Sequence, residues 1–187
     1  MTLKDQILRF EPGCKQESED RLKMLELLQH ETDLLFRSNL RAHFTASAWI
    51  VNPAKTHALM VYHNLYDSWS WTGGHADGDK DLLAVALREA MEETGIPSFR
   101  PLRTAPISLE ILSVQSHMRR GIRVDAHHHL NLTYFLMADE DRPLTANPRE
   151  NSAVKWFRQD EIPGVVSEPH MLPIYRKLIH RASQPDM

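Results

Sequence analysis

The sequence predicts an α/β fold in which helices pack against a β-sheet. Runs of β-branched and aromatic residues bounded by turn residues recur through the middle of the chain, a clearly delimited helix lies between them, and helical spacing of apolar residues marks both ends. With 187 residues, 42% hydrophobic and 25% charged, the chain fits one domain with a modest extension, and two full domains would be cramped.

The N-terminal part, residues 1–42, is predicted to be a helical extension packed on the core, and residues 43–187 are predicted to form the main domain. Apolar residues recur at helical spacing across residues 17–30, and a shorter helix is expected over residues 3–10, ended by the turn residues that follow it. The extension carries no motif that points to chemistry.

The main domain is expected to begin with a β-hairpin. Residues 44–51 and 57–62 are β-prone and are separated by a turn at residues 52–55. Further strands are expected over residues 69–72, 107–114, 128–137 and 153–157.

Two helices complete the predicted elements. The helix over residues 82–94 has agreeing signals at its ends, because Asp79 or Asp81 can cap its N-terminus and Gly95 can adopt the left-handed conformation just beyond its last turn. A last helix is expected over residues 171–181, where the apolar side chains form one stripe.

Composition argues against several classes of partner. The 22 Lys and Arg residues against 25 Asp and Glu give a net charge of −3, so no extended nucleic acid is expected and any phosphate recognition must be local. No apolar run approaches the ~20 residues that span a bilayer, so no membrane insertion is expected. The single cysteine, Cys14, and the lack of a secretory pattern favour a cytoplasmic location.

Three carboxylates share one face of the predicted helix over residues 82–94. At about 100° per residue, Glu89, Glu92 and Glu93 fall within about a third of the circumference. The opposite side, expected to be buried, carries Leu83, Leu87, Ala90 and Met91. Like charges at this spacing repel, whereas Mg²⁺ prefers oxygen ligands and is commonly bound by carboxylates together with substrate phosphates. The pattern therefore suits a phosphate-handling metal site.

A solvated acidic helix face is the simpler explanation of these glutamates. The residues before the helix argue against it, because a strand with Trp69 and Trp71 leads directly into Gly73 and Gly74. With no side chain in the way, the carbonyl of Gly74 can come close to a metal ion.

Residues 74–96 resemble the Nudix box, whose pattern is G-x5-E-x7-R-E-U-x-E-E-x-G-U, with U a bulky aliphatic residue. Every spacing matches, and the family positions are occupied by Gly74, Arg88, Glu89, Glu92, Glu93, Gly95 and Ile96, with the small Ala90 at the first U. The departure is Lys80, which stands where the family has its first glutamate. The neighbouring Asp79 and Asp81 could substitute for it, or Lys80 could contact a substrate phosphate.

A second stretch resembles the same family. Residues 156–163 have the sequence WFRQDEIP, similar to the W-F-x-x-D-E-L segment that follows the last core strand in many Nudix proteins. Glu150 lies close to where the family often keeps a further carboxylate on a mobile loop. The resemblance covers about residues 43–163 and implies a Nudix-type α/β/α sandwich with a mixed sheet.

The resemblance also implies a metal site. Glu89, Glu92 and Glu93, with the carbonyl of Gly74, would hold one or more Mg²⁺ or Mn²⁺ ions, which neutralise phosphate oxygens and activate a water for attack on phosphorus. The proton of that water would go to Glu93, Glu89 or Glu150, since the family uses different bases in different members.

Arg88 would act in the catalytic site by orienting Glu89 through an ion pair. The simpler alternative is a surface ion pair of Arg88 with Glu92, one turn further along the helix, and Arg88 can form both ion pairs at once.

Three arginines and several aromatic residues are candidates for substrate binding. Arg119, Arg120 and Arg123 surround Gly121 in an expected loop, where they could grip substrate phosphates or form an ordinary solvated basic loop. The aromatic residues could stack on a nucleobase, although most are expected in the core; they are Tyr62, Tyr66, Trp69, Trp71 and Tyr134.

The three consecutive histidines at residues 127–129 suggest a zinc site. Alternate side chains of a strand point to opposite faces, so at most His127 and His129 converge, and a third ligand would have to come from elsewhere. Solvated or hydrogen-bonded histidines near a cleft are the favoured interpretation.

The leading hypothesis is a Mg²⁺-dependent pyrophosphohydrolase that cleaves a phosphoanhydride bond in a nucleoside diphosphate-linked or similar small-molecule diphosphate. The alternative, supported only by Lys80, is a catalytically impaired Nudix-derived module that binds a similar ligand. An isoprenoid diphosphate isomerase ranks last, because that reaction requires a cysteine within the core and Cys14 precedes it. A homodimer is a further expectation, because Nudix proteins are often dimers.

Overall fold

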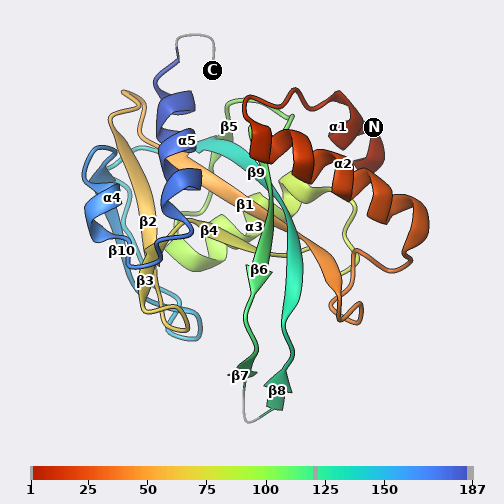
Figure 1. The fold of residues 1–187 in the computed structure, drawn as a ribbon. Coiled ribbons are helices and arrows are strands. Elements are labelled where there is room, and N and C mark those ends of the chain that lie inside the picture. The colour runs from red at the N-terminus through yellow and green to blue at the C-terminus, as the bar shows by residue number, and fades with distance from the viewer. Residues whose placement is uncertain (1, 120–121, 185–187) are drawn as a thin grey trace.

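One mixed sheet of eight strands organises the computed structural model, which describes residues 2–119 and 122–184. Five strands lie side by side in the order β10 (Asn151–Arg158), β2 (His57–His63), β1 (Ala42–Val51), β9 (His127–Met137) and β5 (Arg100–Pro101) (Figure 1). The remaining three pair with members of this row: β3 (Ser68–Ser70) with β2, β4 (Thr72–His75) with β1, and β6 (Ser108–Val114) with β9. The pairing of β1 with β9 is parallel and the others are antiparallel.

Strand β1 is the centre of the sheet, and all of its residues are buried. It pairs with β9 along its whole length, while Ile50 and Val51 pair with β2 and residues 45–48 pair with β4. The predicted hairpin of β1 and β2 is thereby confirmed. Strand β4, which contains Gly73 and Gly74, thus pairs with the fully buried central strand.

Helices cover both faces of the sheet. Phe44, Ala46, Ala48 and Ile50 of β1 pack in one apolar cluster with residues of α3 (Leu82–Thr94). Trp49 and Val51 pack in a second cluster with α4 (Ile162–Val165) and α5 (Leu172–Ala182). Alternate side chains of β1 thus point to opposite faces of the sheet and pack in two separate cores. This arrangement is the α/β/α sandwich expected from the sequence (Figure 1).

The N-terminal residues form two helices that pack on the same core as α3. Helix α1 (Leu3–Arg9) and helix α2 (Lys15–His30) contribute the fully buried Ile7 and Met24 to that cluster. Both helices were predicted, and the division of the chain at residue 42 stays a prediction. None of the helices in the described part of the chain has the length and apolar composition needed to cross a bilayer.

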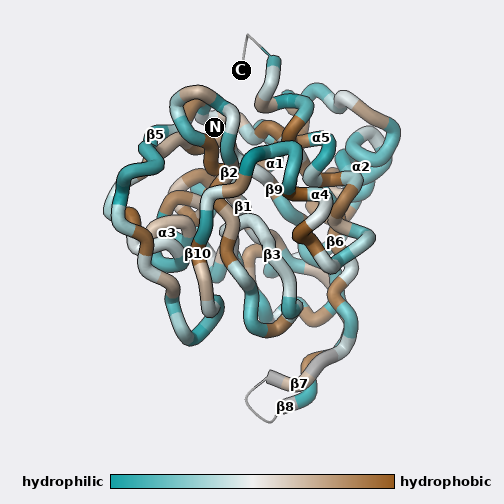
Figure 2. The backbone as a smooth tube through the Cα atoms, turned by 90° about the vertical axis from the view of Figure 1, so that its left-hand side faces the viewer, coloured by the Kyte–Doolittle hydropathy of each residue, from teal (hydrophilic) through white to brown (hydrophobic). Residues whose placement is uncertain are grey.

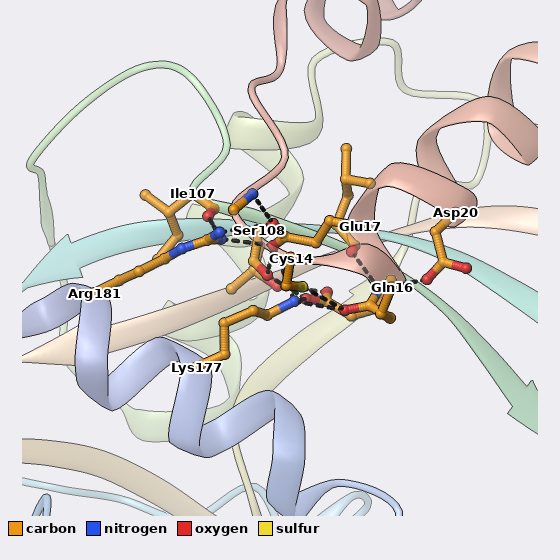
Figure 3. Close-up of polar contacts among 12 residues, drawn as sticks. Cys14, Gln16, Glu17, Asp20, Ile107, Ser108, Lys177 and Arg181 are labelled. Atoms are coloured by element: carbon orange, nitrogen blue, oxygen red, sulfur yellow. Dashed lines mark hydrogen bonds and ion pairs between the residues drawn. The ribbon is translucent and has the colours of Figure 1, made fainter.

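A buried ionic cluster joins α2 to α5. In Figure 3 the side chains of Glu17, Lys177 and Arg181 point toward one another. Arg181 Nη1 lies 2.6 Å from Glu17 Oε1, and Lys177 Nζ lies 2.9 Å from both Glu17 Oε1 and Glu110 Oε1. Burial alone would raise the pKa of Glu17, but hydrogen bonds from Arg181, Gly13 and Lys177 outweigh it and lower the pKa to about 2. Glu17 is therefore ionised although it is fully buried.

The strand expected over residues 69–72 is in fact two strands, β3 and β4. The chain leaves the edge of β2 and crosses to β1 at Trp71, whose buried ring meets the Tyr175 ring edge-on at 5.4 Å between centroids. The sequence of residues 69–72 looks like one strand, but its first part pairs with β2 and its last part with β1. No local pattern reveals this change of partner.

The loop expected around Gly121 is shorter than the sequence suggested, because Arg119 and Arg123 lie in strands. The chain there forms a two-stranded hairpin of β7 (His117–Arg119) and β8 (Ile122–Val124), which projects away from the rest of the molecule (Figure 2). The β-branched residues Ile122 and Val124 favour a strand. Arg120 lies outside the described residues.

The buried side of α3 differs from the expectation. Of the four residues expected to be buried, only Ala90 is, whereas Leu83, Leu87 and Met91 are half-buried. The buried apolar residues in the first turns are Leu82, Val85 and Ala86. They lie seven, four and three positions before Glu89, so they share its side of the helix. Glu89 and Glu93 therefore face the sheet, whereas Glu92 is exposed to solvent.

Candidate active site

Strand β4 and helix α3 bring two glycines against two glutamates. The backbone N–H of Gly73 donates a 3.0 Å hydrogen bond to Glu93 Oε1. Glu93 is only 4% exposed, so this bond fixes one oxygen of a nearly buried carboxylate. Asp81 caps the start of α3 through a 3.1 Å bond to the N–H of Ala84, and Gly95 ends the helix at φ 74°, as predicted.

Gly74 lies directly against Glu89. A Cβ at position 74 would overlap the Glu89 carboxyl group, so only glycine leaves room for this contact. Arg88 Nη2 lies 3.3 Å from Glu89 Oε1, and Arg88 Nη1 lies 3.7 Å from Asp79 Oδ2. Arg88 therefore pairs with Glu89, as expected, and with the aspartate of the preceding turn.

Glu150 completes a group of three carboxylates from the loop before β10. The side chain of Asn151 donates a 3.0 Å bond to the backbone carbonyl of Glu93, and its Oδ1 accepts one from the N–H of Asn147, which ties this loop to α3. One oxygen from each of Glu89, Glu93 and Glu150 lies within 4.8 Å of the others. The three residues that the sequence offered as proton acceptors therefore meet.

The electrostatics of this group are unfavourable without a cation. Burial, and then repulsion by neighbouring carboxylates, raises the pKa of Glu93 well above its usual value against the effect of the Gly73 hydrogen bond. Burial also raises the pKa of Glu89, which Arg88 partly opposes. Oxygen donors at this density match the preference of Mg²⁺ and Mn²⁺ for carboxylates, so the residues fit such an ion.

Two residues of the motif lie apart from this group. Glu92 is exposed and is not one of the three clustered carboxylates, although it lines the cavity into which those three also face. Lys80 is exposed in the turn before α3 and lines neither of the two cavities at the site. Asp79 and Asp81, which could have replaced the missing glutamate, instead pair with Arg88 and cap α3.

Two adjoining cavities form the cleft. The acidic cavity, of about 580 Å³, has Glu89, Glu93 and Glu150 in its wall. The inner cavity, of about 330 Å³, lies between the sheet and the segment before α5. Gly73, Gly74 and Glu93 belong to the walls of both cavities. A ligand can therefore reach from the carboxylates into the inner cavity.

Of the three arginines that the sequence singled out, only Arg123 has a described side chain, and it lies outside the cleft. Arg123 is exposed, pairs with Asp125 at 3.1 Å, and is absent from both cavity walls, while Arg119 lies in β7. The acidic cavity is instead lined by Arg37 and Arg149. Neither residue belongs to a sequence motif, and only the fold brings them to the carboxylates.

Most aromatic candidates are in the core, as expected. Tyr134 is fully buried and Trp71 is 7% exposed. Tyr66 differs, because it is 40% exposed, stacks on His63 with 4.4 Å between ring centroids, and lines both cavities. Trp71 also lines the inner cavity, so Tyr66 and Trp71 are the rings placed to meet a ligand, Tyr66 from the more exposed position.

Histidines gather beside the cleft. His127 and His129 converge on one face of β9, while His128 faces the other way and lies 3.3 Å from Ser113 Oγ. His43 of β1 and His75 of β4 join the first pair. The sequence placed the first two correctly and could not identify the other two, which come from separate strands.

Comparison with known proteins identifies the fold. A family model described as NUDIX domain matches residues 41–181. No curated protein matches the chain. Among solved structures, a hydrolase of the NUDIX family from Clostridium perfringens is similar with a TM-score of 0.57 and 18% identity, over 74% of this chain and 97% of that one.

Two further structures show the same fold at low identity. The E. coli dihydroneopterin triphosphate pyrophosphohydrolase is similar with a TM-score of 0.55 and 15% identity, over 74% of this chain and 95% of that one. The NUDIX domain of Shewanella oneidensis NrtR, complexed with ADP ribose, is similar with a TM-score of 0.54 and 17% identity, over 84% of this chain and 97% of that one.

Proposed function

This chain belongs to the NUDIX domain family, and on that premise we propose that it is a Mg²⁺- or Mn²⁺-dependent pyrophosphohydrolase. Its substrate is a nucleoside diphosphate-linked compound or a similar small-molecule diphosphate. Water replaces the bridging oxygen at one phosphorus, the phosphoanhydride bond breaks, and the proton of the water goes to a carboxylate.

The observation that carries this proposal is the meeting of Glu89, Glu93 and Glu150 at the mouth of an inner cavity. A bound Mg²⁺ or Mn²⁺ supplies charge neutralisation for the phosphate oxygens and acidifies the attacking water. The chain's own contribution is to hold two carboxylates rigidly, through Gly73 and Arg88, and a third on a loop.

The metal ligands proposed are Glu89, Glu92 and Glu93 with the carbonyl of Gly74. Glu92 would reach the ion from its exposed position on the rim of the acidic cavity. Glu89, Glu93 and Glu150 are the candidates for the proton acceptor. Arg88 is a positioning residue, because its contacts are to Glu89 and Asp79.

The proposed substrate lies with its diphosphate over the acidic cavity and its other part in the inner cavity. Arg37 and Arg149 are placed to meet phosphate oxygens, and Tyr66 offers a ring to a base or sugar. Arg119, Arg120 and Arg123 stay candidates for a longer or mobile part of the substrate. Two of the similar structures are a dihydroneopterin triphosphate pyrophosphohydrolase and a NUDIX domain in complex with ADP ribose, which supports the substrate class.

The test is a substrate screen with the purified chain. Nucleoside diphosphate sugars, dinucleoside polyphosphates and nucleoside triphosphates are incubated with Mg²⁺, with Mn²⁺ and with a chelator. We expect phosphate-containing products only with metal. Glu93→Gln should lower kcat by about 10²-fold or more, because it removes a charged ligand or base.

Glu26→Gln is the matched control, because Glu26 is exposed on α2 and, within the described part of the chain, forms an ion pair with Lys23 alone, at 2.9 Å. It should leave turnover unchanged. No metal-dependent turnover across the panel, or equal turnover in Glu93→Gln and the parent chain, would contradict the proposal.

The non-cleaving alternative depends on Lys80 neutralising the carboxylates. Among the described residues, Glu89 pairs with Arg88 and has no ion pair with Lys80. A Mn²⁺ titration separates the two hypotheses, since a neutralised site would not bind the ion. A cytoplasmic homodimer completes the proposal, and light scattering on the purified chain tests the oligomeric state.

A further inference from the structure

Four histidines from three neighbouring strands meet beside the cleft. His43 of β1 pairs with His129 of β9 in parallel register, and His75 of β4 is the register partner of Thr45. Residues that are register partners, and residues two apart in one strand, share a face of the sheet. His43, His75, His127 and His129 therefore all project from the same face, as one cluster that we term the histidine cluster.

The distances within the histidine cluster suit a shared ion. One ring nitrogen from each of His43, His75 and His129 lies within 4.8 Å of the others. His127 Nε2 lies 3.2 Å from His129 Nε2. In a tetrahedral zinc site with Zn–N bonds of about 2.0–2.1 Å, two ligand nitrogens are about 3.3 Å apart. Small side-chain rotations would thus bring the rings to binding distance.

His43 presents a lone pair that no described group satisfies. Its Nδ1 lies 3.0 Å from the carbonyl oxygen of Asn39, so Nδ1 carries the hydrogen and Nε2 is the acceptor. Nε2 is buried without a hydrogen-bond partner among the described residues, and His43 as a whole is only 4% exposed. A buried acceptor without a partner is destabilising unless an ion or water satisfies it.

His127 is oriented in the same way. Its Nδ1 lies 2.8 Å from the carbonyl oxygen of Asp125, which leaves its Nε2 as the acceptor facing His129. A backbone carbonyl bound to one ring nitrogen, with the other nitrogen free to bind, is the usual arrangement around metal-ligating histidines. Two members of the histidine cluster are therefore already set in the tautomer that a metal requires.

Burial favours the neutral form of two of these rings. It lowers the pKa of His43, and burial together with the repulsion that a proton on His75 or His43 would exert lowers the pKa of His129 to about 2. The nearby positive charge of Arg37 is balanced by Asp77, whose Oδ1 lies 2.7 Å from Arg37 Nε. Neutral imidazoles can accept a cation, whereas protonated ones cannot.

We propose that His43, His75 and His129, with His127 as a fourth imidazole, bind a divalent transition metal ion such as Zn²⁺. Nitrogen donors select Zn²⁺, Ni²⁺, Co²⁺ or Cu²⁺ over Mg²⁺, so this site differs in chemistry from the carboxylate site.

The proposed ion lies at the cleft. His75 lines the acidic cavity and His129 lines the inner cavity, so the histidine cluster borders both. An ion there adds a positive charge beside the cleft, where the proposed diphosphate would bind. The site is separate from the hydrolytic proposal, because it uses none of the carboxylates.

The test is Zn²⁺ binding to the full, chelator-treated chain in excess Mg²⁺, which occupies the carboxylate site. Competition with a coloured chelator measures affinity, and the visible spectrum of bound Co²⁺ reports nitrogen coordination. We expect one Zn²⁺ per chain and a rise in Tm on binding. His129→Asn and His75→Asn should each weaken binding by more than about 100-fold, the upper end of the loss seen when only an outer-sphere partner is removed.

His128→Asn is the matched control, because it changes the same residue type on the same strand but on the opposite face. It should bind Zn²⁺ like the parent chain, and so should Glu93→Gln, whose loss belongs to the other site. If His129→Asn does not fold, His127→Asn gives the second measurement, with a smaller but measurable loss. No Zn²⁺ bound by the parent chain, or equal binding in the parent chain and His75→Asn, would overturn the proposal and leave a packed histidine cluster.

Discussion

Gly74 and Glu89 touch so closely that a Cβ on the glycine would overlap the carboxyl of the glutamate. The carboxyl is the far end of a flexible side chain, so an added methyl group would displace it and leave the backbone in place. The carboxyl of Glu89 therefore keeps its place against β4 only when position 74 has no side chain.

Gly74→Ala should accordingly disable the site and spare the fold. We expect Mn²⁺ affinity to fall at least about tenfold and kcat/KM to fall about 10²-fold, the size of effect that a displacement of about 1 Å has at a reacting centre. Tm should change by only a few degrees. Gly164→Ala is the control, because a Cβ there meets nothing within 4 Å. Unchanged metal affinity in Gly74→Ala would contradict the contact.

Glu150→Gln assigns the role of the loop carboxylate. Because Glu150 is exposed and comes from a loop, the substitution should leave folding intact. We expect kcat to fall by about 10²-fold or more. If Mn²⁺ affinity is retained, Glu150 accepts the proton, and if affinity falls in parallel, it is a ligand. A variant that keeps full turnover would remove Glu150 from the site.

Lys80→Glu restores the residue that the family pattern has at this position, and it should change little. Lys80 is exposed and lies outside both cavity walls, so its charge is screened by solvent. We expect kcat/KM to stay within about threefold of the parent value, since screened surface charges contribute well under 1 kcal/mol. A tenfold gain in turnover would mean that Lys80 suppresses the carboxylate site.

Glu17→Gln tests the buried ionic cluster. It leaves Lys177 and Arg181 without their carboxylate partner, so the free energy of unfolding at pH 7 should fall by about 3–5 kcal/mol in urea titrations. Glu19→Gln, on the exposed side of the same helix, should cost less than about 1 kcal/mol.

The same carboxylate predicts a pH dependence. Its pKa is near 4.5 when unfolded and about 2 when folded, so its contribution is present above pH 4.5 and is lost as pH falls toward 2. The stability difference between the parent chain and Glu17→Gln should therefore shrink over this range. A difference that stays constant between pH 5 and pH 3 would contradict the assignment.

Local pattern predicted the elements that carry the motif. The spacing of Glu89 and Glu93, the cap at Asp81 and the stop at Gly95 depend on neighbours within one or two turns, and the structure has all of them in place. The prediction of which face of α3 is buried was wrong. A helical wheel cannot tell which side of a helix meets the sheet when both sides carry apolar residues.

Contacts between distant segments could not be predicted from the sequence. The histidine cluster needs the register of β1 against β4 and β9, and a single sequence does not encode that register locally. Arg37 and Arg149 reach the acidic cavity for the same reason. The hairpin of β7 and β8 was missed because its strands are only three residues long, shorter than the runs that a period of two can identify.

The contact of Glu17 with Arg181 also sets an order of events during folding. The two residues are 164 positions apart, so a chain emerging from the ribosome presents α2 long before α5 exists. Until α5 arrives, the carboxylate of Glu17 has neither cation and favours a solvated position over a buried one. Closing so long a loop is slow relative to forming local helices. The ion pairs that join α2 to α5 can therefore form only after the last helix is in place, whereas the apolar contacts of the N-terminal helices with the cluster around α3 do not depend on it.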